Sequence, residues 1–238
     1  MQHRPFALFG TYALEEISQN FSWFAEMREQ NPVFKDERTR LWQVFRYEDV
    51  LSILTDYSRF SSHAYELTGG FLSNSLIAKD PPDHRKLRNL VNQAFTPRAV
   101  AHLSDRVTQI TQELLDEVRH KGAMDIVADI AFPLPAKVIA ELLGVPAEDW
   151  NIFQRWARVD GSDAASRRES GQSMQEEMFN YFTNLLDERR RVPREDLISS
   201  LSVAEVDGER LSEPELLSFC TLLLAAGQET TKNSITPQ

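Results

Sequence analysis

Residues 216–235 read LLSFCTLLLAAGQETTKNSI, a segment that is apolar through its middle and has the length of a helix. The preceding SEPE, residues 212–215, is a helix start signal, with Ser212 as the N-cap and Glu215 three residues later. A helix that is apolar on most sides is expected in the centre of a protein, covered all round. We therefore predict a central helix. Because the sequence stops at Gln238 with nothing left to cover this helix, we expect the sequence to be cut.

The rest of the chain has mostly helical spacing. Two short strands are predicted at Val33–Lys35 and Leu41–Phe45, on either side of the charged turn 36–40. A loop is predicted at Ser62–Lys79, and a polar stretch, Asp160–Gly171, lies between two predicted helices. We therefore predict a mainly α fold with a small β-sheet, in a single domain that covers residues 1–238. Besides the last helix, apolar periodicity predicts helices through 21–27, 50–54, 83–95, 97–121, 129–143, 147–159, 172–191 and 195–203.

Composition excludes several classes of function. The 238 residues carry 26 Lys and Arg against 36 Asp and Glu, and a net charge of −10 argues against binding to nucleic acid or to an anionic membrane. The only cysteine, Cys220, excludes an internal disulfide and a Cys-rich zinc site. The longest apolar run, 222–226, is far shorter than the roughly 20 residues that span a bilayer. The first residues contain no secretory signal, so we expect a cytoplasmic protein.

The small residues near the end of the last helix are a candidate site. Gly227 inside a helix costs about 1 kcal/mol relative to Ala, which indicates that something needs room there. Ala226 and Thr230 share a face, and the Thr230 hydroxyl can bond back to the Ala226 carbonyl. These residues could line a cavity with one polar group. Equally, Gly227 could simply admit a neighbouring element.

A second candidate lies in the helix after Pro81-Pro82. His84 and Arg88 are four residues apart and so project from the same face, where they could hold two carboxylates. The alternative is a solvated basic face. Cys220 is interpreted as a small buried hydrophobe, and the run Arg189-Arg190-Arg191, like the pair Glu176-Glu177, as a solvated helix face without chemistry.

Three segments together resemble one family, the cytochromes P450, and specifically their soluble bacterial members. DPPDHRKLRNLVNQAFTPR (80–98) resembles the family's C-helix signature and the connection that follows it. FPLPAKVIAELLGVP (132–146) resembles the next helix and its stop, and LLLAAGQETT (222–231) resembles the distal I helix. The resemblance implies the N-terminal part of a cytochrome P450 fold.

The resemblance also implies a haem-dependent monooxygenase with an assignment for each candidate residue. His84 and Arg88 would bind the haem propionates, Ala226 and Gly227 would line the dioxygen groove, and Glu229 and Thr230 would be the acid–alcohol pair that supplies protons. The substrate would be a small apolar organic molecule, bound between the loop Ser62–Lys79 and the region Phe153–Gly171. Electrons would come from NAD(P)H through a ferredoxin or flavodoxin and its reductase, docking near Arg85 and Lys86.

The sequence also departs from the family pattern. The family's axial cysteine, in a loop near the C-terminus, and the preceding Glu-x-x-Arg pair have no counterpart up to residue 238, so no metal ligand is assigned. Cys220 lies on the helix that resembles the distal one and cannot replace the axial cysteine. We therefore expect little or no activity from this chain alone. The alternatives are a non-catalytic fragment that binds haem or another apolar ligand, with His63 or Cys220 as an opportunistic ligand, and a helical interaction protein.

Overall fold

The computed structural model describes residues 14–37, 40–63, 73–95, 97–157 and 166–236. They belong to two compact units, one formed by Met1–Ser62 with Asp160–Arg167 and the other by His63–Val159 with Arg168–Gln238. The single domain expected over residues 1–238 stays a prediction. The mainly α fold class with small sheets is confirmed by the order of the elements.

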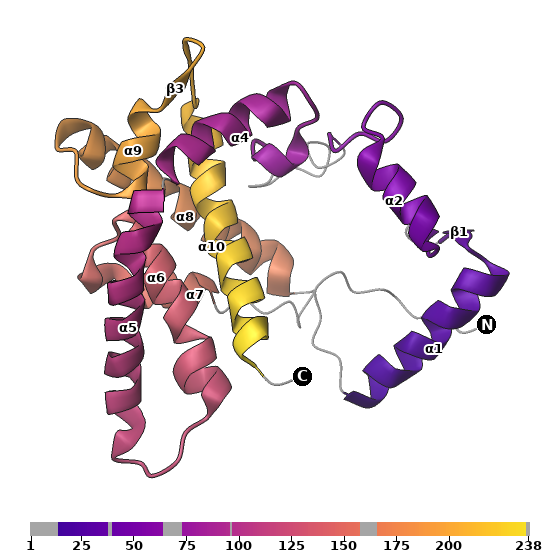
Figure 1. Ribbon diagram of the computed structural model, residues 1–238, viewed down its shortest axis with the longest axis horizontal. Coiled ribbons are helices and arrows are strands. Elements are labelled where there is room, and N and C mark those ends of the chain that lie inside the picture. The colour runs from indigo at the N-terminus through magenta and orange to yellow at the C-terminus, as the bar shows by residue number, and fades with distance from the viewer. Residues whose placement is uncertain (1–13, 38–39, 64–72, 96, 158–165, 237–238) are drawn as a thin grey trace. The chain divides into compact units, whose positions relative to one another are not determined.

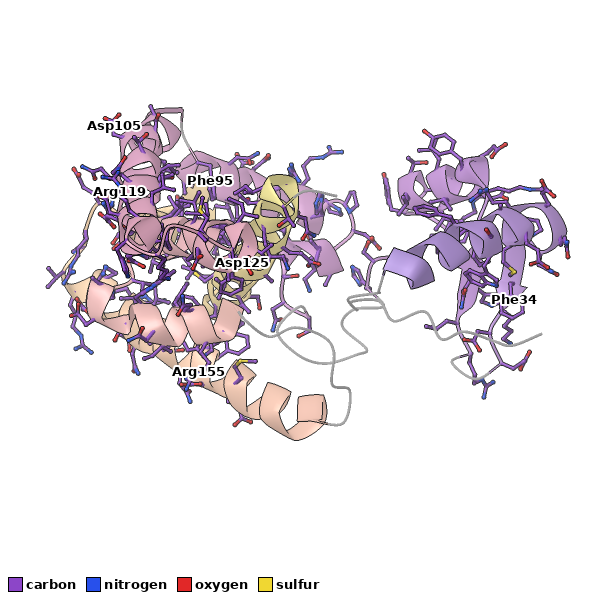
Figure 2. The ribbon with its side chains drawn as sticks, turned by 90° about the horizontal axis from the view of Figure 1, so that it is seen from below. Phe34, Phe95, Asp105, Arg119, Asp125 and Arg155 are labelled. Carbon is purple, nitrogen blue, oxygen red and sulfur yellow. The ribbon has the colours of Figure 1, made fainter. Side chains whose placement is uncertain are left out.

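The first unit contains a helix, a two-stranded sheet and a second helix: α1 (Leu14–Gln30), β1 (Val33–Lys35), β2 (Trp42–Val44) and α2 (Tyr47–Thr55). The strands are antiparallel, with Phe34, labelled in Figure 2, opposite Gln43. Trp23 of α1 packs edge-on against Phe45, with ring centroids 5.3 Å apart. Both predicted strands are therefore confirmed. The aromatic contact packs α1 against the residue that follows β2.

The second unit is almost entirely helical, and Figure 1 shows α10 running through it beside α6 and α7. Its main core is formed by α6, α7, α8, α9 and α10, with Val91 and Ala94 of α4. A smaller cluster joins α5 to η2 through Ile110, Leu114 and Ile130. In chain order, the elements are η1 (Leu76–Ala78), α4 (Asp83–Ala94), α5 (Pro97–Arg119), η2 (Ile126–Ala131), α6 (Pro133–Leu143), η3 (Ala147–Asp149), α7 (Trp150–Ala157), α8 (Ser166–Arg191), α9 (Leu197–Val203), β3 (Glu205–Val206), β4 (Glu209–Arg210) and α10 (Glu213–Ile235).

The helix predicted over 129–143 is two elements in the structure. η2 is a π-helical turn capped by Asp125, whose carboxylate accepts hydrogen bonds from the N–H groups of Val127 and Ala128 at 2.9 and 3.1 Å. α6 starts afresh at Pro133, because a proline has no N–H to continue the preceding turn. The predicted stop is confirmed: Gly144 caps α6 with a φ of 81°.

Other elements also differ from the prediction. α8 begins at Ser166 rather than near 172, so the predicted polar stretch continues as helix where the structure describes it. β3 and β4 form a hairpin around Asp207 and Gly208, which have φ values of 54° and 80°. An Asp-Gly pair favours such a turn, so this hairpin was open to prediction. Of the predicted loop Ser62–Lys79, residues 64–72 lie outside the described part, and η1 occupies its end.

Candidate functional site

The C-terminal half of the last helix, α10, has one covered face and one open face. The covered face carries Leu217, Thr221, Leu224 and Gln228, spaced three or four residues apart and at most 6% exposed. On the other face, Ala226, Glu229 and Thr230 are exposed, whereas Gly227 is half-buried. The expectation that the helix is covered all round holds for its first half, where residues 216–221 are all buried, whereas beyond Leu224 its neighbours pack along one side only. The predicted site residues Ala226, Glu229 and Thr230 lie together on the open side.

Gly227 lies at a close approach between α10 and α6. A Cβ built at Gly227 would come within 2.6 Å of Ile139 Cδ1, so the glycine leaves room for this isoleucine. The Thr230 hydroxyl donates a hydrogen bond to the Ala226 carbonyl oxygen at 2.7 Å, as the sequence predicted. Of the two interpretations given for Gly227, admission of a neighbouring helix has the geometric support.

Gln228 links α10 to the junction between η2 and α6. Its side-chain Nε2 donates a hydrogen bond of 2.8 Å to the carbonyl oxygen of Phe132, 96 residues earlier in the chain. The residue is 5% exposed, and its Oε1 atom is buried without a hydrogen-bond partner. The sequence analysis assigned Gln228 no role. The available signal was its position four residues after Leu224, where an apolar residue would have continued the buried stripe.

The structure places His84 and Arg88 one turn apart on α4, with His84 half-buried and Arg88 exposed. The buried face of the same helix carries Leu87, Leu90, Val91 and Ala94. At its end, Phe95 packs edge-on against Phe219 of α10, with ring centroids 6.2 Å apart (Phe95 is labelled in Figure 2). Within the second unit, this contact joins the helix that carries the basic pair to the helix that carries the acid–alcohol pair.

The hairpin of β3 and β4 packs against a further face of α4. Lys86 forms an ion pair with Glu209, with 2.9 Å between Nζ and Oε1, and Gln93 donates a hydrogen bond of 3.1 Å to the carbonyl oxygen of Glu205. The hydrogen bond to Glu209 raises the pKa of Lys86. Lys86 is therefore engaged within the chain, whereas Arg85 on the same helix is exposed. This ion pair was not predicted from the sequence, because the hairpin that carries Glu209 was not predicted.

Cys220 is fully buried in the main core between α10 and its neighbours. Burial, and the negative charge of Asp196, raise the pKa of its thiol. Because a metal is bound by an accessible thiolate, the burial of Cys220 argues against it as the opportunistic ligand considered above. The interpretation of Cys220 as a buried hydrophobe is confirmed. His63, the other residue considered, is exposed.

The interpretation of the run Arg189-Arg190-Arg191 as a solvated helix face is wrong for Arg189. It is 1% exposed, and its guanidinium donates hydrogen bonds to the Asp196 carboxylate and, at 2.6 Å, to the carbonyl oxygen of Gly144. Asp196 in turn caps α9 by accepting from the Ser199 N–H at 2.7 Å. One buried ion pair thus joins the ends of α6 and α8 to the start of α9. Arg190 is exposed, as predicted.

The cavity found in the described part of the chain is not lined by any of the predicted site residues. A small open cavity of about 130 Å³ lies between α5, η2, α6 and α7, with Lys121, Lys137 and Trp150 in its lining. Among the described residues, no group of three or more His, Cys, Asp or Glu side chains could hold a metal ion. In that part of the chain, no helix is long and apolar enough to cross a bilayer.

Comparison with known proteins identifies the family. The cytochrome P450 family model matches residues 4–143, more than half of the sequence, so the chain belongs to the cytochrome P450 family. It is 41% identical to cytochrome P450 109 of Bacillus spizizenii, over 90% of this chain and 54% of the relative. It is 39% identical to the cyclomarin C epoxidase CymV of Salinispora arenicola, over 92% of this chain and 59% of the relative.

Solved structures give the same result for the fold. Substrate-free CYP109E1 from Bacillus megaterium superposes with a TM-score of 0.78 at 40% identity, over 89% of this chain and 58% of that one. The polyketide synthase cytochrome P450 PksS of Bacillus subtilis superposes with a TM-score of 0.80 at 38% identity, over 93% of this chain and 58% of that one. The structure is therefore a partial cytochrome P450 fold. The chain spans between 54% and 60% of the length of the curated relatives.

The family implies a haem cofactor, and the residues present fit part of it. The basic pair on α4 suits two carboxylates, and the open face of α10 next to Ala226 offers small side chains to a flat apolar ring. The residues present do not match the axial thiolate ligand, because the sequence has one cysteine and that cysteine is enclosed in the core. The chemistry of these side chains is therefore compatible with the propionates and one face of a haem, whereas the one cysteine is buried and offers no accessible thiolate.

Proposed function

We propose that this chain provides the distal side of a haem-dependent monooxygenase that hydroxylates a small apolar organic substrate with dioxygen and electrons from NAD(P)H. The observation that supports it most is the arrangement of α10, where Ala226, Glu229 and Thr230 share the exposed face while the opposite face is fixed to α6. Residues that served only packing would lie on the covered face. Haem, when bound with a thiolate ligand, activates dioxygen for insertion of one oxygen atom into the substrate.

In this proposal, His84 and Arg88 bind the two propionates through charge-assisted hydrogen bonds. The small side chain of Ala226 and the backbone at Gly227 leave space beside the ring. Glu229 and Thr230 hold and pass protons, the carboxylate exchanging with solvent because it is exposed and the hydroxyl held by its bond to the Ala226 carbonyl.

Electron delivery by a ferredoxin or flavodoxin with its reductase belongs to the same proposal. The exposed guanidinium of Arg85 is available to an acidic partner, whereas Lys86 already has Glu209 as its counter-ion. Arg85 is therefore the better candidate for a docking contact. The substrate region 153–171 is described only in part, since residues 158–165 lie outside the described residues.

A second function is favoured by the burial of Cys220. Without an accessible cysteine, this chain alone would bind haem or another apolar ligand without the thiolate that drives oxygen activation. We infer that the isolated chain turns over little or no substrate. Normal turnover by the purified chain, supplied with electrons and substrate, would refute that inference.

Haem titration of three single variants tests the binding site. His84→Ala and Arg88→Ala each remove one propionate contact and should weaken haem binding by about 10- to 150-fold, since a hydrogen bond to a charged group contributes about 1.5–3 kcal/mol. Arg85→Ala removes an exposed charge from the same helix and is the matched control, with an expected change below two-fold. Equal affinities for all four proteins would contradict the assignment of His84 and Arg88.

A further inference from the structure

Gln228 combines features that packing alone does not explain. It is the last residue of the buried stripe of α10, in a position where leucine would bury more apolar surface without leaving an amide oxygen unsatisfied. A buried polar group without a partner costs about 1–3 kcal/mol. A geometric task would offset that cost, and the hydrogen bond made by this side chain indicates which one.

That bond fixes the orientation of the amide. The Phe132 carbonyl oxygen can only accept, so the Gln228 side chain must present its NH₂ group to it, at 2.8 Å, and turn Oε1 elsewhere. Phe132 is the residue between η2 and α6, and its own N–H bonds back to the Val127 carbonyl at 2.9 Å. The bond therefore ends on a segment whose backbone is itself held by hydrogen bonds.

Gly227 and Gln228 act on the same side of α10. The close approach to Ile139 at Gly227 sets the distance between α10 and α6, and the bond from Gln228 sets the position of α10 along and around its axis. Apolar contacts alone tolerate sliding and rotation, whereas a hydrogen bond weakens steeply once its geometry is lost. The next two residues along the chain are Glu229 and Thr230, on the open face.

We propose that Gln228 is a positioning residue: its bond to the Phe132 carbonyl holds the turn 226–230 of α10 in the rotation that presents Glu229 and Thr230 on the open face. This inference rests on the proposed function for the importance of those two residues. The positioning itself is a property of the chain that is measurable without haem.

The test uses the full 238-residue chain and three variants. Gln228→Met keeps the length and unbranched shape of the side chain and removes the bond, and Gln228→Leu serves as a second variant should methionine disturb folding. Ser218→Ala is the matched control, since Ser218 is also a fully buried residue of α10 with an unpartnered oxygen. It carries no bond to the η2–α6 junction.

Amide hydrogen exchange and the side-chain rotamer of Thr230 are the measurements. Loss of the bond should speed exchange at residues 226–231 about five- to ten-fold, as expected for one hydrogen bond, and should average the χ1 scalar couplings of Thr230. Ser218→Ala should change neither quantity. Exchange within two-fold of the wild type in both Gln228 variants, or equal loosening by Ser218→Ala, would overturn the proposal. Haem titration judges the proposed function separately, so the two can fail independently.

Discussion

At the scale of single residues, Gly227 shows how a small side chain can be dictated by a neighbour. Gly227→Ala would gain about 1 kcal/mol in helix propensity but would place a Cβ 2.6 Å from Ile139 Cδ1, and overpacking of this kind costs about 1–3 kcal/mol. We expect a net loss of about 1 kcal/mol by urea denaturation. In an Ile139→Val background, which lacks Cδ1 and leaves Cγ1 as the nearest atom at 3.3 Å, the same change should cost clearly less. The same loss in both backgrounds would show that Ile139 is not the cause.

Arg189 and Arg190 form a matched pair at the same scale. Arg189→Met would leave Asp196 buried without its counter-charge, and breaking a buried ion pair in this way costs about 3–5 kcal/mol. Arg190 makes exposed pairs with Asp187 and Glu213, so Arg190→Met should cost less than about 1 kcal/mol. Denaturant midpoints of the two variants check the difference. Similar midpoints would mean that the Arg189 pair contributes little.

At the scale of elements, the start of α10 depends on a capping box. The Glu215 carboxylate accepts the Ser212 N–H at 2.8 Å and the Ser212 hydroxyl at 2.7 Å. Glu215→Ala should lower the free energy of unfolding by about 1 kcal/mol, whereas Glu215→Gln keeps an acceptor and should lower it by less than half as much. Thermal unfolding of both variants measures this. If glutamine were as costly as alanine, a charge effect rather than the cap would be responsible.

Local sequence rules were sufficient for elements whose ends are set by their own residues. Ser212 and Glu215 predicted the start of α10, and Gly144 the end of α6, because caps act through adjacent backbone groups. The rules were not sufficient where partners are distant in sequence. The bond from Gln228 to Phe132 spans 96 residues, and Arg189 is buried by Gly144 and Asp196, which no helical periodicity within 189–191 reveals.

The candidate site could likewise be predicted from the sequence only in part. The spacing of His84 and Arg88 and of Ala226 and Thr230 is helical, so the sequence was enough to predict which residues share a face. Which face of α10 is open depends on α6, and the engagement of Lys86 depends on a hairpin more than 110 residues away. Burial and pairing of this kind arise from tertiary packing, which a single sequence does not contain.

At the scale of the whole molecule, the reactivity of the Cys220 thiol shows whether the core is folded. Its thiol is fully buried with a raised pKa, so we expect no reaction with iodoacetamide in the folded chain and complete reaction in denaturant. Ser234→Cys adds an exposed cysteine to the same helix and should react at once, which shows that the reagent is active. Rapid alkylation of the wild type under native conditions would contradict the enclosed position of Cys220.

The central claim is that this partial cytochrome P450 fold carries residues for one face of a haem and supplies no thiolate to the iron. The most direct measurement is the absorption spectrum of the chain reconstituted with haem, reduced and exposed to carbon monoxide. We predict a Soret band without the strong red shift that thiolate ligation produces. A strongly red-shifted band from the 238-residue chain would contradict the claim, and Cys220 would then have to be the ligand.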